Sequence, residues 1–455
     1  MKPFTTARRA LAALLVAVIP VLALAAPKTA TPKVNFTKYK LKNGLTVLYS
    51  RDVSAPVVSV AVTYNVGSFV EPVGRTGFAH LFEHMMFQGS ANVGKGEYMG
   101  IIQDIGGSLN GTTGQDRTNY FSTVPANQLE LPLFLEADRM ATLDVSQVNL
   151  DNQRAVVQEE RRQSYDNRPY GQVFETLLKN TSSIQPYTHA PIGSMEDLNK
   201  ATLQDVQTFF ANWYGPSNAV LSVVGDFEEA KLKALIDKHF GPIPARSVPP
   251  LPSLKEPFQK EEKRVALKDP LAPLPSYTAA WQIPHNNHKD IPALDMLCTV
   301  LSGGKSTRLY QSLVEEQQVA TSAMVGVMPR RGMGLLLAMM SFAPGQSVEK
   351  AEQALEAEVE RVKTSGVTDA EMETARRQAR QAQIRGLRTV EDRATNLGEY
   401  AVVFGNPNRI NTYLPDLYKV TPADVQRVAK EYLVKNRRTV VITEPAPSPT
   451  TEEKS

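Results

Sequence analysis

Thr202-Leu-Gln-Asp-Val-Gln207 and Thr421-Pro-Ala-Asp-Val-Gln426 share four residues at one constant offset of 219 positions. The same offset pairs Trp213 with Tyr432, and it pairs the β-branched stretch 220–223 with 439–442. Each copy predicts a helix with a threonine N-cap, then a short turn and a strand. A unit that recurs in this way indicates an internal duplication.

The duplication divides the chain into two blocks of similar size, 35–240 and 261–443. Between them, residues 241–260 form a linker, because the six prolines from position 242 to 257 disfavour both helix and interior strand. Residues 26–34 are expected to be an extended lead-in. Residues 444–455 are rich in Pro, Ser, Thr and Glu and are expected to be a disordered tail.

The first block mixes strand and helix patterns. Strands are predicted at 46–48 and 57–64, with Asn43-Gly44 as a hairpin turn. Helices are predicted at 76–87 and 150–165. Because the two kinds of element are interspersed, we expect an α+β fold in which each block is a sheet covered by helices on one face.

Composition narrows the class of protein. The chain has 455 residues, 42% of them hydrophobic and 21% charged, which is typical of a globular protein with two or more domains. There are 50 basic and 47 acidic residues, and Lys2, Arg8 and Arg9 account for the excess. The rest of the chain is neutral overall and has no basic tract, which excludes nucleic acid as a partner.

Residues 1–25 have the pattern of a secretory signal peptide. Basic residues precede an apolar run at 10–24, and Ala23-Leu24-Ala25 provides a small-residue cleavage site before Ala26. The alternative is a membrane anchor, but the run is shorter than the roughly 20 residues that cross a bilayer. We therefore expect a periplasmic or secreted protein with no membrane span after cleavage. Its single cysteine, Cys298, permits no intramolecular disulfide.

The chemistry centres on His80-Leu81-Phe82-Glu83-His84. On a helix, His80 and His84 are four residues apart and project from one face, so both imidazoles can reach one ion. Glu83 lies near that face and can take a proton from a metal-activated water. This H-x-x-E-H spacing predicts one zinc ion, Zn²⁺, per chain.

A third ligand is expected from the helix at 150–165. On a helical wheel, Val156 and Val157 centre the buried stripe, with Glu160 inside it and Glu159 well outside. A carboxylate on a buried face needs a partner such as a metal ion, which favours Glu160.

These motifs and the duplicated blocks resemble the pitrilysin/insulinase (inverzincin) family of zinc metallopeptidases, in particular its two-domain, processing-peptidase-like bacterial branch. The resemblance implies an α+β chain of two homologous sheet-plus-helix domains, of the LuxS/MPP-like metallohydrolase type, joined by the Pro-rich linker. It implies a zinc metalloendopeptidase that hydrolyses peptides or unfolded polypeptide segments. His80, His84 and Glu160 would bind zinc, and Glu83 would be the catalytic base.

The resemblance also implies a substrate-binding edge strand, with Asn110, Gly111 and Thr112 in place of the family's Asn-Ala followed by Thr. Strand addition would then bind the substrate backbone. The alternative interpretation of Asn110 is that of a turn residue.

The sequence departs from the family pattern in both blocks. Gln153 stands where many relatives carry a glutamate seven residues before the ligating one. In the second block, the family's substrate-binding Arg and Tyr are replaced by other residues in an ungapped alignment. Arg308 and Tyr310 lie nearby and are candidate substitutes.

These departures determine which partner chain we expect. In the family, four such domains enclose the substrate, so a two-domain chain is expected to dimerise. We expect a heterodimer with a paralogue that lacks the zinc motif but carries the Arg/Tyr pair, with a homodimer as the alternative. The alternative function is a non-catalytic zinc-binding scaffold or chaperone subunit of the same fold.

Overall fold

A computed structural model describes residues 33–342 and 345–446. The predicted signal peptide lies outside this range, as does nearly all of the lead-in. Within the described residues, no helix combines the length and the apolar character needed to cross a membrane.

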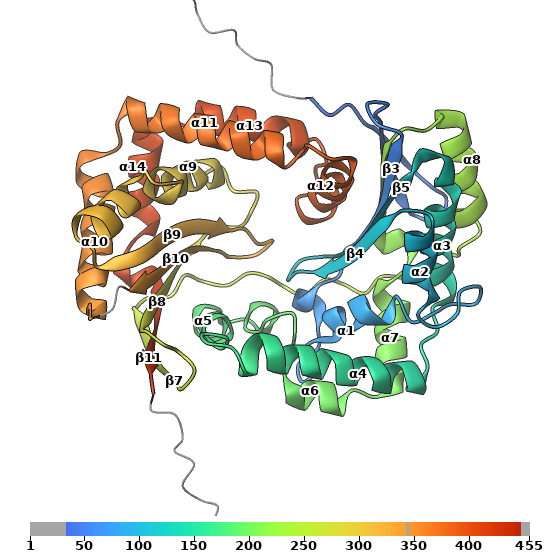
Figure 1. Ribbon diagram of the computed structural model, residues 1–455, viewed down its shortest axis with the longest axis horizontal. Helices are drawn as coiled ribbons and strands as arrows, with labels where there is room; N and C mark the ends of the chain where they lie inside the picture. Colours follow the sequence, from blue (N-terminus) through green and yellow to red (C-terminus); the bar gives the residue numbers. More distant parts are fainter. Residues whose placement is uncertain (1–32, 343–344, 447–455) are drawn as a thin grey trace, which may run out of the picture. The chain divides into compact units, whose positions relative to one another are not determined.

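The first half is built on a six-stranded sheet of order β1-β2-β6-β3-β5-β4 (Figure 1). Its strands are β1 (Thr37–Lys40), β2 (Thr46–Arg51), β3 (Val57–Tyr64), β4 (Ser108–Thr113), β5 (Thr118–Pro125) and β6 (Ala219–Gly225). β2 and β6 are parallel, and the other neighbouring strands are antiparallel. Among the described residues β4 has a strand on one side only, so it forms an edge of the sheet.

The second half repeats this arrangement with a five-stranded sheet of order β7-β11-β8-β10-β9. Its strands are β7 (Lys263–Asp269), β8 (Ser276–Ile283), β9 (Ala320–Met328), β10 (Gly334–Phe342) and β11 (Arg438–Pro445). β11 lies between β7 and β8 and is parallel to β7, just as β6 lies between β2 and β3 and is parallel to β2. The order matches β2-β6-β3-β5-β4, which confirms two homologous α+β domains.

Helices surround each sheet. In the first half they are α1 (Phe78–Met85), α2 (Glu97–Asp104), α3 (Glu130–Thr142), α4 (Gln147–Arg161), α5 (Val173–Thr181), α6 (Met195–Lys200), α7 (Leu203–Trp213) and α8 (Glu229–Phe240). In the second half they are α9 (Ile291–Ser302), α10 (Val348–Ser365), α11 (Asp369–Arg385), α12 (Val390–Val403), α13 (Arg409–Lys419) and α14 (Pro422–Tyr432).

The repeated hexapeptides form the same local structure twice. Thr202 caps α7 and Thr421 caps α14, each in a capping box with the aspartate three residues later. Each box satisfies backbone N–H groups that the first helical turn leaves without partners. A strand follows in both copies, β6 and β11, so the predicted order of cap, helix, turn and strand is confirmed.

The face of the first sheet that packs on its own helices is formed by alternate residues. Val58, Val60 and Val62 of β3 belong to a large apolar core with Phe82 of α1 and Leu133 of α3. This alternation follows from the two-residue period of a strand, which sends neighbouring side chains to opposite faces.

The opposite face of each sheet receives a helix from the other half, which the sequence did not predict. α12 of the second half packs against β3, β5 and β6 of the first sheet, and α5 of the first half packs against β8 and β11 of the second. In α12, Ala394 and Leu397 form a separate buried cluster with the sheet residues Leu48 and Ala61. The expectation of helices on one face therefore holds only for helices of the same half.

Polar contacts also fix α12 on the first sheet. Arg393 pairs with Asp52, and Glu391 accepts a hydrogen bond from Thr123 at 2.9 Å. Gly398 lies so close to β3 that a Cβ atom there would overlap the Thr63 hydroxyl. A glycine lets the helix approach the sheet at this point.

The linker and the tail differ in detail from their predicted forms. Residues 241–262 contain no helix or strand, and contacts with the first half hold this segment: Arg246 donates to the Tyr214 carbonyl at 2.9 Å. At the C-terminus, β11 includes Glu444 and Pro445, so the predicted tail begins two residues too early. The remainder of that tail, 447–455, lies outside the described residues.

We expect Gly398→Ala to destabilise the protein by about 1–3 kcal/mol, because the added methyl group overpacks the contact between α12 and β3. The measurement is urea unfolding followed by circular dichroism. Gly100→Ala is the control: a Cβ atom at Gly100 in α2 meets nothing within 4 Å, so that change should be neutral or stabilising. Equal effects of the two changes would contradict the close approach of α12.

Candidate metal centre

Helices α1 and α4 bring His80, His84 and Glu160 together. The two imidazole rings project from one face of α1 with their centroids 4.8 Å apart. Glu160 reaches them from α4: one carboxylate oxygen lies 3.6 Å from His80 Nε2 and the other 3.2 Å from His84 Nε2. One ligand atom from each residue falls within 4.8 Å of the others. Among the described residues, this is the group of three or more His, Cys, Asp or Glu side chains that could hold a metal ion.

The donor set suits zinc. Zinc in proteins favours imidazole nitrogen and carboxylate oxygen in tetrahedral geometry, with neighbouring donor atoms about 3.4 Å apart. The observed separations of 3.2 and 3.6 Å bracket that value. Three protein donors also leave one position for water, as catalytic zinc sites require.

Burial keeps His80 neutral, which is the form that binds metal. Burial, together with the charge of the neighbouring His84, lowers the pKa of His80 to about 4, although Glu160 opposes both effects. The hydrogen bond with His84 lowers the pKa of Glu160, so this carboxyl is ionised at neutral pH. Neutral imidazole and ionised carboxylate are the protonation states of metal ligands.

The helical-wheel argument selects Glu160, which is the glutamate that lies next to the two histidines in the structure. One of the two valines on which that argument rested is nevertheless exposed. Glu159 is exposed and bonds Arg162 and Gln163 on the surface. Val157 is buried as expected, but Val156 is exposed. The buried stripe of α4 runs instead through Leu150, Gln153 and Val157, and Glu160 continues it.

Glu83 lies beside the group without being part of it. The Thr113 hydroxyl of β4 donates a hydrogen bond of 2.6 Å to Glu83 Oε2. Burial raises the pKa of Glu83, and the bond from Thr113 opposes that rise. A carboxyl held in this way next to the metal-ligand cluster is suited to accept and return a proton.

The three predicted substrate residues occupy the edge strand β4, but they face different sides. A Cβ atom at Gly111 would lie 3.0 Å from Glu83 Cγ, so glycine gives the base room against the strand. Asn110 is exposed, and its side-chain oxygen accepts from the Gly111 backbone nitrogen at 2.9 Å. Thr112 bonds Asn119 on β5. By alternation, Gly111 and Thr113 face α1 while Asn110 and Thr112 face away from it.

Sequence reasoning missed the groups that hold α1 and Glu83 in place. Glu71, which is buried, accepts from the backbone nitrogens of Gly77 at 2.9 Å and Ala79 at 2.8 Å. His189 Nε2 lies 2.8 Å from the same carboxylate. No spacing in the sequence links Glu71, His189 or Thr113 to the H-x-x-E-H motif, because they meet it only through tertiary contacts.

The remaining predicted residues are engaged elsewhere. Gln153 is buried in α4, where its amide donates to Asn152 at 2.6 Å. Arg308 is paired with Glu371 at 2.6 Å and also donates to the Gly366 carbonyl, both in the second half. Tyr310 begins the helical turn Tyr310–Glu316. The structure does not bring these three side chains into contact with the histidine pair.

The fold has two homologous α+β domains, and its H-x-x-E-H helix faces a carboxylate on a second helix. These features are typical of a class of metallopeptidases. Comparison with known proteins identifies the family. The model "Insulinase (Peptidase family M16)" matches residues 46–193, and "Peptidase M16 inactive domain" matches residues 200–379. The zinc protease PqqE of Helicobacter pylori is 31% identical over 413 residues, which cover 89% of this chain and 92% of that protein.

Comparison with solved structures supports the same family. A crystal structure of a protease from Helicobacter pylori has 30% sequence identity and a TM-score of 0.86, covering 90% of this chain and 100% of that one. The periplasmic protease PqqL of Escherichia coli has 17% identity and a TM-score of 0.75; the match covers 94% of this chain and 49% of PqqL, and it shows the shared fold. This chain belongs to the insulinase family, peptidase family M16.

We expect one zinc ion per chain, and we expect His80→Ala, His84→Ala and Glu160→Ala each to weaken its binding strongly, since each removes one of three protein ligands. Metal content after dialysis, measured by mass spectrometry, tests this. Glu159→Ala is the matched control, because it removes the neighbouring carboxylate from the exposed side of α4 and should leave the zinc bound. Loss of zinc in Glu159→Ala but not in Glu160→Ala would contradict the assignment.

Proposed function

We propose that this protein is a zinc-dependent endopeptidase that hydrolyses peptides or unfolded polypeptide segments. The observation that carries the proposal is the convergence of His80, His84 and Glu160 beside a separate, half-buried Glu83. The Glu160 carboxylate adds a third donor to the two imidazoles, which supports a metal site, and the additional carboxyl of Glu83 outside the donor set supports hydrolysis. The names of its relatives as zinc proteases support the same activity.

In this proposal His80, His84 and Glu160 hold the zinc ion. When bound there, zinc lowers the pKa of water and polarises a peptide carbonyl. Glu83 takes the proton from the attacking water and gives it to the leaving amine. Thr113 holds the Glu83 carboxyl through its hydrogen bond, which fixes the direction of proton transfer.

The edge strand β4 supplies the binding surface for substrate. Its backbone groups on the side away from β5 have no strand partner among the described residues, so an extended peptide can add to the sheet there. The contact of Gly111 with Glu83 puts this edge directly next to the proposed base. Backbone recognition of this kind favours unfolded segments over folded proteins.

The second candidate function is a non-catalytic scaffold or chaperone subunit. It is favoured by the match of residues 200–379 to a model described as an inactive domain. That match begins after Glu160, so it includes none of the four residues of the proposed catalytic centre. We therefore favour catalysis.

Glu83→Gln should retain zinc and lose peptide cleavage by several orders of magnitude, because it removes the proton acceptor and preserves the shape of the side chain. The experiment pairs metal analysis with digestion of a broad peptide library, followed by mass spectrometry. A wild-type protein that binds one zinc ion but cleaves no peptide, alone or with a partner chain, would favour the scaffold function.

We also propose that the protein is exported and that its mature N-terminus is Ala26. The signal-peptide pattern of residues 1–25 supports export. N-terminal sequencing of protein from fractionated cells should give Ala26 in the soluble periplasmic or secreted fraction. An intact Met1 in the membrane pellet would contradict it.

Finally, we propose a heterodimer with a paralogue that lacks H-x-x-E-H but carries an Arg/Tyr pair. The length of PqqL supports pairing, since this chain matches 49% of that protein. The engagement of Arg308 with Glu371 also supports an outside source of the substrate-binding arginine. The alternative is a homodimer in which Arg308 and Tyr310 act on substrate.

Purified alone, the chain should cleave peptides poorly, and addition of the paralogue should restore activity. Size-exclusion chromatography with light scattering would measure the assembly, and a peptide assay would measure cleavage. Full activity from a homodimer, abolished by Arg308→Ala or Tyr310→Phe in a correctly folded variant, would contradict the heterodimer.

A further inference from the structure

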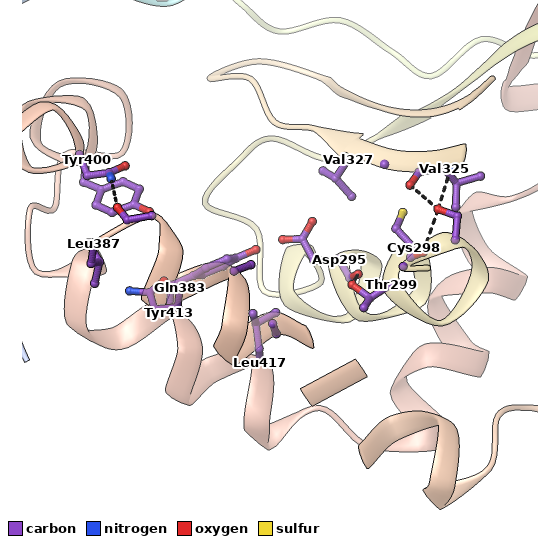
Figure 2. A pocket seen from close by; sticks show the side chains of 17 residues that line it. Asp295, Cys298, Thr299, Val325, Val327, Gln383, Leu387, Tyr400, Tyr413 and Leu417 are labelled. Carbon is purple, nitrogen blue, oxygen red and sulfur yellow. Dashed lines mark hydrogen bonds between the residues drawn. The ribbon is translucent and has the colours of Figure 1, made fainter. Parts of the chain in front are cut away.

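The second half contains a cavity of about 470 Å³ that the proposed peptidase mechanism does not use (Figure 2). Its walls come from α9, β9, α11, α12 and α13. The volume falls within the range of sites for small organic molecules. The walls combine apolar side chains, among them Val325, Val327 and Leu417, with a few polar groups.

Asp295 is the charged group of this cavity. Figure 2 shows its carboxyl group directed from α9 into the space between Val327 and Tyr413. Among the described residues, no side chain or backbone group donates a hydrogen bond to that carboxyl. Burial raises the pKa of Asp295 to about 7, and the charge of Arg409 opposes the rise. A carboxylate in such surroundings gains from a cationic partner that fills its acceptor positions.

Arg409 does not donate a hydrogen bond to the Asp295 carboxyl. Its guanidinium group stacks on the rings of Phe404 at 4.4 Å and Tyr413 at 4.0 Å. The described residues that line the cavity include no lysine or arginine. Arg409 therefore acts on the Asp295 carboxyl through its charge, without a hydrogen bond to it among the described residues.

The other polar groups also offer acceptors. Gln383 uses its amide nitrogen to donate to the Ile410 carbonyl, and Asn396 uses its own to donate to the Gly386 carbonyl, both at 2.9 Å. Their side-chain oxygens have no donor among the described residues. Ser302 is already committed, because it both donates to and accepts from the backbone of Val325.

Aromatic rings complete the lining. Tyr400 of α12 and Tyr413 of α13 both border the cavity. Aromatic faces attract cations and repel anions. A carboxyl beside apolar walls and the Tyr400 ring favours a positively charged donor over an anion.

We propose that this cavity binds a primary alkylammonium group on an aliphatic stem. Such a group donates to the Asp295 carboxyl, and its stem matches the apolar side chains that line the cavity. A metal ion is disfavoured, because a single carboxylate among apolar walls provides too few ligands. The same chemistry is found in free aliphatic amines and in lysine side chains of polypeptides.

The test is isothermal titration calorimetry of the full-length protein with n-butylammonium chloride, with n-butanol as the neutral probe. We expect n-butylammonium to bind with a Kd in the range of about 1–10 mM, since so small a ligand has few atoms to contribute. n-Butanol should bind much more weakly. Absence of n-butylammonium binding, or equal binding of the two probes, would overturn the proposal.

Variants assign the binding to this cavity. Asp295→Asn should weaken n-butylammonium binding by about tenfold or more, because the charge-assisted hydrogen bonds are lost. Val327→Phe should also abolish it, by filling the cavity with the carboxylate intact. Asp416→Asn is the matched control, since Asp416 is a carboxylate on the same helix as Tyr413 that does not line this cavity. Unchanged affinity in Asp295→Asn, with thermal unfolding like that of the wild type, would overturn the proposal.

A blocked lysine derivative, Nα-acetyl-lysine methylamide, distinguishes the two sources of the ammonium group. If it binds with an affinity similar to that of n-butylammonium, the cavity accepts lysine side chains of polypeptides. If only n-butylammonium binds, the cavity accepts free amines. Both results support the alkylammonium site, and both are independent of peptide cleavage at the metal centre.

Discussion

The hydrogen bonds from the backbone nitrogens of Gly77 and Ala79 to the buried carboxylate of Glu71 fix the position at which α1 begins. A carboxylate at a helix N-terminus satisfies N–H groups that lack partners and opposes the positive end of the helix dipole. His80 and His84 follow within the next two turns, so their direction depends on this start. A shift of α1 by one residue would rotate both imidazoles by about 100° away from Glu160.

Arg117 couples the two halves near the edge strand. Arg117 donates to the Thr112 carbonyl of β4 at 2.9 Å and pairs with Glu399 of α12 at 3.2 Å. The same helix lines the second-half cavity with Asn396 and Tyr400. α12 is thus linked through Arg117 to the strand beside the proposed catalytic centre, and it also lines the proposed ammonium site.

Local patterns predicted the parts of the structure that depend on local spacing. The repeated hexapeptides predicted a duplication, and the two sheets share a strand order in agreement with it. The four-residue interval between His80 and His84 predicted a shared helix face. The wheel argument selected Glu160, but two valines were too few to place the buried stripe, and Val156 is exposed. Thr113 and the exchange of α5 and α12 could not be foreseen, because they arise from contacts between segments far apart in the sequence.

Because α5 and α12 each pack on the sheet of the other half, neither duplicated half contains all the helices that cover its own sheet. A fragment that ended in the linker at 241–260 would keep its own sheet but lose the helix that covers one of its faces. That fragment would expose the apolar residues Leu48, Ala61 and Val224, which are buried by α12 in the intact chain. The two halves therefore complete each other: two such fragments would cover these apolar sheet faces only by associating, and the covalent linker raises their effective concentration.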